Sequence, residues 1–459
     1  MAPVPVPLRV VRMGQAGEGV GYLPDGRVAF VAGALPGELV RVGITEEHTH
    51  FVRAQALAVD LPSPERISPV CPVYARCGGC NFQHWAYAAE LRHKEQQVRD
   101  ALARIGGLDP ATVRPIIGAA DPYGYRNKGQ FPWGSDGQGR PRLGLYARRS
   151  HQVVPVDACA IQDAVVNAVL PVARQLAESL GLSVYEEGVH RGILRHLLVR
   201  SSRLERRALV AIVVAEMDDR LAEFARRLME AVPAVAGVAA NVNPGHGNRV
   251  LGPTTHLLAG SAYLHEQILG LTFRLSALAF FQVNPQQVEP LYRAAIATLV
   301  GHSARVWDLY AGVGTLACLA AHRAKNVTAV EVHPEAVKDG RVNAALNHMS
   351  NVTFYQGTVE TVLARTQEIA QERPNVVLVD PPRSGLSADV LHLLTRLKPA
   401  RITYVSCNPA TLARDGERLQ ETYRLAWVQP VDMFPRTDHV ESCAAFEYRD
   451  RLPKPCNAK

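Results

Sequence analysis

The feature that most constrains the fold is a regular alternation of short apolar segments and helix-length segments, which begins near residue 290. The apolar segments have the length and composition of strands, and they lie at 304–309, 326–331, 352–356, 375–380 and 401–406. Strands that alternate with helices in this way predict an α/β, Rossmann-like, doubly wound and mainly parallel sheet. Such a sheet binds ligands at the carboxyl ends of its strands, so the residues after each strand are the candidate site.

The N-terminal part of the chain has a different pattern. Short apolar segments at 28–31, 39–44 and 52–59 are separated by Pro and Gly turns, which predicts a small OB-like β-barrel. Apolar residues at helical spacing predict a helix over 87–105, which ends at a Gly-Gly pair. Mixed strand and helix patterns follow between 120 and 275.

A chain of 459 residues is too long for one hydrophobic core. We predict three domains: a barrel at 1–60, a mixed α+β central domain at 61–275 and a catalytic domain at 276–459. The helix at 87–105 can pack on the catalytic domain.

Composition and charge narrow the class of protein. No run of about 18 apolar residues occurs, so no membrane span is expected. The first ten residues contain three prolines and lack the apolar core of a signal peptide, which predicts a cytoplasmic protein. The net charge of +7 fits a polyanionic partner, although many basic proteins bind no nucleic acid.

The first strand of the predicted sheet ends in a glycine loop that indicates a nucleotide-type ligand. Gly312 and Gly314 allow a tight turn and a close approach of the ligand to the backbone. With Ala317 they also satisfy the dinucleotide pattern GxGxxG/A, so NAD and S-adenosylmethionine fit equally well here. In both cases Glu331, at the end of the second strand, can accept the ribose hydroxyls.

Two later loops at the same edge favour a methyltransferase. They read Asp380-Pro381-Pro382-Arg383 and Ser406-Cys407-Asn408-Pro409. Proline keeps the preceding residues extended, so their side chains can point outward. A free cysteine is most often a small buried hydrophobic residue, but polar neighbours and a loop position indicate a nucleophile at Cys407.

Pyrimidine chemistry needs such a nucleophile because C5 of uracil is a poor nucleophile by itself. Addition of a thiolate to C6 gives an enolate that can take a methyl group at C5 from a sulfonium. A base must then remove the C5 proton so that the thiolate can leave. His439 and Glu441 precede the last apolar strand and, by alternation, lie on the same face, so either can be this base.

The chain resembles the RNA uracil-5 methyltransferases, and within them the 23S ribosomal-RNA branch with an N-terminal TRAM domain and an iron–sulfur cluster. The similarity runs from about residue 8 to 449, and its motifs are FFQVN at 280–284, the glycine loop after Asp308, DPPR at 380–383, SCNP at 406–409 and HVE at 439–441. The resemblance implies that Cys407 is the nucleophile and Glu441 the base. It also implies a set of residues that bind S-adenosylmethionine: Gln282, Tyr310, Gly312, Gly314, Thr315, Glu331 and Asp380. One position departs from some members, because Gly357-Thr358 stands where others place Asn or Asp.

A cysteine cluster predicts a metal site. Cys71, Cys77 and Cys80 are three of the eight cysteines, and Cys159 is the best candidate for a fourth ligand. Thiols that are kept reduced in a cytoplasmic protein bind zinc or an iron–sulfur cluster, and the spacing does not decide between them. The resemblance implies one [4Fe–4S] cluster, in a structural or RNA-positioning role.

The predicted RNA contacts lie on the barrel and on a basic loop. The loop contains Arg126, Asn127, Lys128 and Gln130, which match a family loop near the target uridine. Arg and Lys are expected to meet phosphate, and Asn or Gln to contact a base. The target uridine must leave its stack to be reached, and Phe280 can flank it, although core packing of Phe280 and Phe281 is an equal alternative.

Three functions are compatible with these motifs. The first is methylation of a uridine in 23S rRNA, and the second is the same chemistry on a tRNA uridine. The third is a non-catalytic RNA-binding iron–sulfur protein, against which the intact Cys407, Glu441 and cofactor loop argue. A methyltransferase that acts on amino groups is disfavoured, because Arg383 occupies the place of its aromatic residue. No protein partner is implied, so a monomer is expected.

Overall fold

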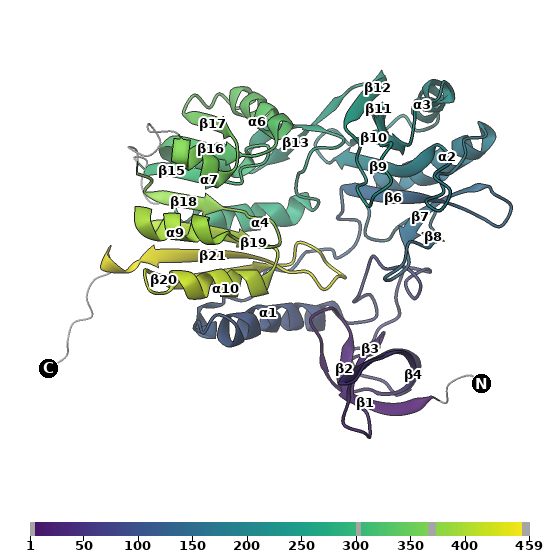
Figure 1. The fold of residues 1–459 in the computed structure, drawn as a ribbon, viewed down its shortest axis with the longest axis horizontal. Coiled ribbons are helices and arrows are strands. Elements are labelled where there is room, and N and C mark those ends of the chain that lie inside the picture. Colours follow the sequence, from purple (N-terminus) through teal and green to yellow (C-terminus); the bar gives the residue numbers. More distant parts are fainter. Residues whose placement is uncertain (1–4, 300–303, 366–372, 452–459) are drawn as a thin grey trace.

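The computed structural model describes residues 5–299, 304–365 and 373–451 (Figure 1). The N-terminal strands form a closed barrel in the order β1-β2-β3-β5-β4, and its interior is filled by small aliphatic side chains. This arrangement confirms the predicted barrel. Its strands are β1 (Val6–Met13), β2 (Gly19–Tyr22), β3 (Val28–Ala32), β4 (Leu39–Glu47) and β5 (Phe51–Leu61).

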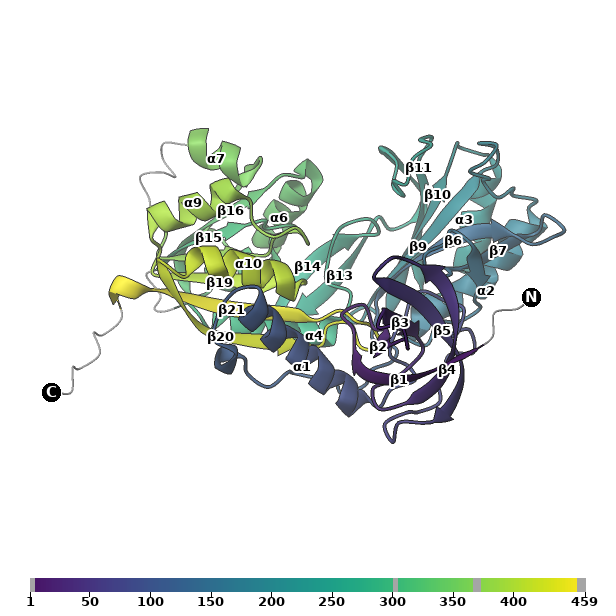
Figure 2. The same ribbon diagram turned by 60° about the horizontal axis from the view of Figure 1, so that its bottom comes forward.

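Helix α1 (Tyr87–Arg104) connects the barrel to the rest of the molecule. It contacts α10 (Pro409–Leu419) and β20 (Tyr423–Val431), and its apolar face joins the core of the C-terminal sheet through Val98 and Leu102. Figure 2 shows α1 running along the C-terminal sheet toward the barrel. The predicted helix is therefore confirmed, and it packs on the C-terminal sheet as expected.

The central part of the chain forms a seven-stranded mixed sheet in the order β12-β11-β10-β9-β6-β7-β8. Helices α2 (Ala164–Ser179) and α3 (Arg220–Ala231) contact each other and share one core with this sheet. The strands are β6 (Lys128–Ser135), β7 (Pro141–Tyr146), β8 (Val153–Pro155), β9 (Leu194–Ser202), β10 (Arg207–Val214), β11 (Val235–Val242) and β12 (Thr254–Gly260). A hairpin of β13 (Tyr263–Ile268) and β14 (Leu271–Ser276) follows, and its Phe273 and Leu275 belong to the C-terminal core.

The C-terminal sheet has seven strands in the order β17-β16-β15-β18-β19-β21-β20, and β21 runs antiparallel to the other strands of this sheet. Its strands are β15 (Ala304–Leu309), β16 (Ala324–Glu331), β17 (Val352–Gln356), β18 (Val376–Val379), β19 (Arg401–Ser406), β20 (Tyr423–Val431) and β21 (Glu441–Tyr448). The predicted doubly wound sheet is thus confirmed, and three of the predicted strands match to the residue.

Helices cover both faces of this sheet, as the alternating pattern requires. One face carries α4 (Pro285–Ile296), α5 (Thr315–Ala321) and α6 (Pro334–Leu346). The other face carries α7 (Val359–Arg365), α9 (Ala388–Leu397) and α10, with α1 beside them. The strand order reverses between β15 and β18, and ligands of such sheets bind at this point. None of the helices in the described ranges combines the length and apolar character that crossing a membrane requires.

Candidate functional site

The glycine loop after β15 lies at the reversal of strand order. The amides of Tyr310 and Ala311 donate to the Val330 carbonyl at 3.0 and 2.9 Å, which folds the loop over the end of β16. Gly314 has φ +81°, and a Cβ there would lie 2.6 Å from the ring of Phe354. At Gly312, by contrast, no heavy atom lies within 4 Å of a Cβ position, so the backbone borders open space. The loop therefore offers exposed backbone to a ligand.

Glu331 fixes this loop from the end of β16. Its carboxylate is buried, and it accepts hydrogen bonds from the amides of Gly312 at 2.9 Å and His333 at 2.8 Å. Each carboxylate oxygen keeps a second lone pair, which can accept a ribose hydroxyl. Glu331 is 8% exposed, so its carboxylate is not a solvated charge at the strand end. Thr315 is also buried, at the first position of α5.

Three acidic side chains, those of Asp308, Asp380 and Glu441, lie close together near the glycine loop. Burial and the nearby charge of Asp380 raise the pKa of Asp308 to about 8. Burial alone raises the pKa of Asp380, in the loop after β18, to about 7. The hydroxyl of Tyr292 faces Gln282 and the charges of Asp380, Asp308 and Glu441, and burial raises its pKa well above the usual value. Gln282 and Asp380, which were predicted to bind S-adenosylmethionine, therefore lie close to Glu441, which was predicted to be the base.

Strand pairing places the candidate nucleophile beside the candidate base. Strands β19 and β21 are antiparallel, with Ser406 opposite Ser442. The next positions outward are Cys407 and Glu441, and residues opposite each other on neighbouring strands lie on the same face of a sheet. Asn408 caps α10 by accepting a hydrogen bond from the amide of Ala410 at 3.0 Å, which ends the strand directly after the cysteine.

Burial controls the protonation of both groups. It raises the pKa of Glu441, whose side chain is 4% exposed, to about 8, with Asp380 adding to the rise and Arg383 opposing it. Burial, and then the charge of Glu441, raises the pKa of the Cys407 thiol, which Arg383 again opposes. Both groups are therefore held mainly in their protonated forms at neutral pH. Arg383 lies 3.0 Å from Nε2 of His439, and burial lowers the pKa of that imidazole.

A cavity of about 220 Å³ opens beside Cys407. It is formed by the loops after β18 and β19, by the segment before β21, by α1 and by the turn between β1 and β2. The lining residues are Gln15, Gln97, Ala101, Arg383, Cys407, Asn408, Pro409, Ala410, Asp438, His439 and Val440. His439 lines this cavity, whereas Glu441 is buried and does not line it. The structure thus separates two residues that the sequence could not distinguish as the base.

The four predicted cluster cysteines are close in space. Burial, together with the charges of Cys159, Cys77 and Cys71, raises the pKa of Cys80 to about 12, and a hydrogen bond from Gln83 opposes the rise. Sγ of Cys77 accepts from the Gly79 amide, and Sγ of Cys80 from Nε2 of Gln83, each at 3.3 Å. Among the described residues, no three His, Cys, Asp or Glu side chains are grouped as they would be around a single metal ion.

The remaining described cysteines have other environments, and all described cysteines are free thiols. Cys318 and Cys443 are fully buried among apolar side chains.

The predicted RNA-binding residues divide into exposed and buried ones. Phe280 is 74% exposed, whereas Phe281 is only 3% exposed and belongs to the core, so the two phenylalanines have different roles. Gln130 is exposed. Asn127 is fully buried, and within the described residues neither Oδ1 nor Nδ2 of its side chain has a hydrogen-bond partner. Lys128 is partly buried, and its Nζ donates to the carbonyls of residues 278 and 279 at 3.4 and 3.3 Å.

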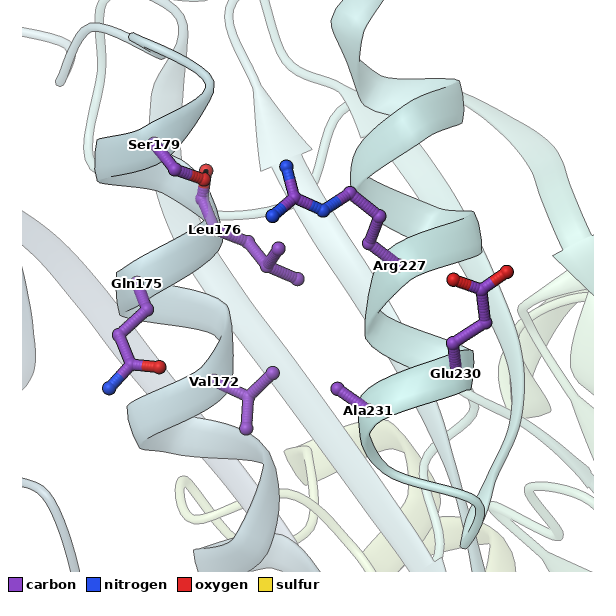
Figure 3. Close-up of a pocket in the computed structure, with 7 residues that line it drawn as sticks. All are labelled: Val172, Gln175, Leu176, Ser179, Arg227, Glu230 and Ala231. Carbon is purple, nitrogen blue, oxygen red and sulfur yellow. Dashed lines mark hydrogen bonds between the residues drawn. The ribbon is translucent and has the colours of Figure 1, made fainter.

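A larger cavity of about 540 Å³ lies between α2 and α3 (Figure 3). Figure 3 shows one wall from Val172 to Ser179 on α2 and the other from Arg227 to Ala231 on α3. None of the predicted site residues lines it. The cavity beside Cys407 is therefore the better candidate for the reaction site.

Comparison with known proteins decides the family. Residues 264–449 match the model of the tRNA (uracil-5-)-methyltransferase family, and residues 6–57 match the TRAM domain. The chain is 40% identical to a protein described as an uncharacterized RNA methyltransferase of Gloeobacter violaceus, over 97% of this chain and 96% of that protein. A second such protein, from Halalkalibacterium halodurans, is also 40% identical, over 93% of both chains. This chain belongs to the RNA uracil-5 methyltransferase family.

A solved structure supports the same assignment. The tRNA (uracil-54, C5)-methyltransferase of Pyrococcus abyssi, in complex with S-adenosyl-L-homocysteine, is similar with a TM-score of 0.76 and 25% identity. The similarity covers 96% of this chain and 100% of that one. Between the two ligands that the glycine loop allowed, family membership decides for S-adenosylmethionine. The protein is therefore a TRAM-containing RNA methyltransferase that uses S-adenosylmethionine.

Sequence reasoning missed some residues of this methyltransferase site. Tyr292 lies on α4 and reaches the acidic group only through the packing of that helix on the sheet. Gln15 and Gln97 lie about 300 residues or more before Cys407 in the chain. No motif marks these three positions, so no signal in the sequence could have identified them.

Proposed function

We propose that this methyltransferase transfers a methyl group to C5 of a uridine in RNA through a covalent bond between Cys407 and C6. The observation that carries the proposal is the pairing of β19 with β21, which sets Cys407 beside Glu441. Asp380 stands next to them, at the end of β18. A nucleophile and a buried carboxyl group at one point of the site are what addition and elimination at a pyrimidine require.

The reaction begins with the thiol of Cys407, whose proton must leave before the sulfur can attack. Neutral His439, which lines the same cavity, takes it, and the charge of Arg383 stabilises the thiolate. The Sγ–C6 bond then forms as the C5–C6 double bond opens, and the electron pair moves to C5 and O4. C5 takes the methyl group, which breaks the methyl–sulfur bond of the donor.

Glu441 completes the reaction as the base. Its carboxylate takes the C5 proton, the C5–C6 double bond re-forms, and the thiolate of Cys407 leaves. Because burial raises the pKa of Glu441 to about 8, its carboxylate is a stronger base than an exposed one. Its buried position also keeps bulk water away from the adduct.

The residues around the glycine loop fit the methyl donor, S-adenosylmethionine, which supplies an electrophilic methyl group on a sulfonium. The open backbone at Gly312 and the carboxylate of Glu331 would hold its nucleoside. Gln282 and Asp380, with Tyr310 and Thr315 on the loop, would hold the remainder near Cys407. Gly314 keeps the loop against Phe354.

For the substrate we propose a uridine of 23S rRNA. The presence of the TRAM barrel together with the cysteine cluster supports this choice. A tRNA uridine is the second candidate, because the similar Pyrococcus abyssi enzyme is named for a tRNA position. Mapping of 5-methyluridine in rRNA and tRNA, with and without this protein in the cell, tests both. A site lost only from 23S rRNA is expected; a site lost only from tRNA supports the second candidate, and no lost site overturns the proposal.

We further propose that Cys71, Cys77, Cys80 and Cys159 bind one [4Fe–4S] cluster. The mutual electrostatic effects of these thiols support a shared site, and four Cys thiolates are the usual ligands of such a cluster. Anaerobically purified protein should contain iron and sulfide in equal amounts. Colourless protein with stoichiometric zinc would contradict the assignment.

The cluster would belong to a central domain at 61–275, between a barrel domain at 1–60 and a catalytic domain at 276–459. This division assigns RNA binding to the barrel, the cluster to the centre and methyl transfer to the C-terminal domain.

A further inference from the structure

The cavity beside Cys407 has one wall that does not come from the catalytic sheet. Gln97 lies on α1, and Gln15 lies in the turn between β1 and β2 of the barrel. Both side chains end in carboxamides. Nε2 of Gln97 donates to the backbone carbonyl of Gln15 at 3.3 Å, whereas the side chain of Gln15 makes no hydrogen bond within the described part of the chain. An exposed amide with free donor and acceptor groups thus lines the cavity that also contains the nucleophile.

The barrel turn is held firmly in this place. Nδ2 of Asn81 donates to the carbonyl of Ala16 at 3.1 Å. Gly17 has φ +76°, and a Cβ there would lie 2.8 Å from Cβ of Asn81, so the turn packs closely on the segment that follows the cysteine cluster. Glu18 accepts from Arg53 of the barrel at 3.0 Å and from Arg149, in the turn between β7 and β8, at 2.8 Å. These contacts fix the barrel relative to the catalytic cavity.

The chemistry of this wall fits a nucleobase better than a phosphate. A phosphate site needs cations or several backbone amides. The polar side chains that α1 and the barrel contribute to this wall are Gln97 and Gln15, and both are neutral. A carboxamide offers both an N–H donor and a C=O acceptor, which match the edge of a pyrimidine or purine. Proteins that recognise RNA by sequence contact such edges on unstacked bases.

We infer that the cavity beside Cys407 is a nucleobase pocket that the barrel helps to close, and that Gln15 and Gln97 contact the target uridine or a nucleotide next to it. The inference rests on the proposed function. It assigns to the barrel a part in base recognition at the reaction site, in addition to general RNA binding. Gln15 is the sharper test, because Gln97 also supports the barrel turn.

The first test measures single-turnover methylation of the RNA substrate by Gln15→Ala and Gln97→Ala. Loss of one hydrogen bond predicts a roughly 3- to 10-fold fall in kcat/KM, with S-adenosylmethionine affinity unchanged. The matched control is Gln138→Ala, which removes an exposed carboxamide from the turn between β6 and β7. The control should behave as wild type, and equal melting temperatures of all variants show that they fold.

The second test locates the base directly. RNAs with 4-thiouridine at the target position, or at either neighbour, are irradiated in complex with the wild-type protein, and the cross-linked peptides are sequenced. A cross-link from at least one RNA to the peptide of Gln15 or Gln97 is expected. Cross-links confined to other regions, or full activity of both Ala variants, would overturn the inference. A wild-type protein that makes no 5-methyluridine would instead overturn the proposed function, so the two failures are distinguishable.

Discussion

Replacement of Lys94 by methionine should destabilise the catalytic part of the molecule strongly. Nζ of Lys94 donates to Oε1 of Glu90 and to Oδ1 of Asp432, both at 2.7 Å, and to the Phe434 carbonyl at 3.1 Å. The three ionisable side chains are 0% exposed. Arg436 adds a second cation, 3.4 Å from Glu90, so the buried charges balance. In Lys94→Met, Arg436 is the one remaining cation of this group, against the two carboxylates of Glu90 and Asp432.

The size of the effect follows from this geometry. Removal of one partner from a buried ion pair costs about 3–5 kcal/mol. Burial already raises the pKa of Glu90, so proton uptake by this group should relieve part of the cost at low pH. For a unit of 150–250 residues each kcal/mol shifts the melting temperature by roughly 2–4 °C, which predicts a fall on the order of 10 °C.

Scanning calorimetry of Lys94→Met at neutral pH measures this shift. The matched control is Arg226→Ala, which removes an exposed helical cation that also pairs with two carboxylates, and its melting temperature should equal that of wild type. The triple variant with Glu90→Gln and Asp432→Asn should recover part of the loss, because no uncompensated charge remains. A fall of less than about 2 °C in Lys94→Met, or no recovery in the triple variant, would refute the reasoning.

Three further predictions concern the reaction site. Because the pKa values of Glu441 and the Cys407 thiol are raised and both act deprotonated, single-turnover methylation should increase with pH through pH 8 and beyond it; a flat profile would contradict these roles. Gly314→Ala should weaken S-adenosylmethionine binding in calorimetry, because the new Cβ would lie 2.6 Å from the ring of Phe354 and would displace the glycine loop. The control Gly26→Ala, at φ +86° in an open barrel turn, should bind S-adenosylmethionine normally. Phe280→Ala should reduce kcat/KM for RNA at least tenfold without changing the melting temperature, because the ring is 74% exposed; normal RNA kinetics would exclude a contact with the substrate.

The sequence was sufficient to predict the catalytic sheet because its strands carry continuous apolar runs. Cys407 could be predicted as the nucleophile because the chemistry of uracil C5 demands a thiolate and the cysteine follows such a run. His439 and Glu441 fitted the base equally well on chemistry, and only the family resemblance favoured Glu441. The direct pairing of Cys407 and Glu441 across β19 and β21 could not be predicted, because it depends on β21 inserting next to β19 in antiparallel orientation.

The basic loop shows a tertiary contact that the sequence did not reveal. The contact of Lys128 with phosphate stays a prediction; in the structure its Nζ donates to the carbonyls of residues 278 and 279, and Arg200 on β9 also donates to the latter. Burial and the neighbouring cations lower the pKa of Lys128 to about 7. The cause is the pairing of β6 with β9 beside the segment that carries Phe280, a tertiary contact that local sequence does not encode. Phe280, by contrast, is exposed as a substrate contact requires.

The most direct test of the account is denaturing electrophoresis of the Glu441→Gln variant with labelled RNA and a labelled methyl donor. If Cys407 adds to C6 and Glu441 removes the C5 proton, addition and methyl transfer occur but elimination stalls. The account predicts a slowly migrating protein band that carries both labels, and no such band for the Cys407→Ala, Glu441→Gln double variant. An adduct in the double variant would exclude Cys407 as the nucleophile, and normal turnover by Glu441→Gln would exclude Glu441 as the base.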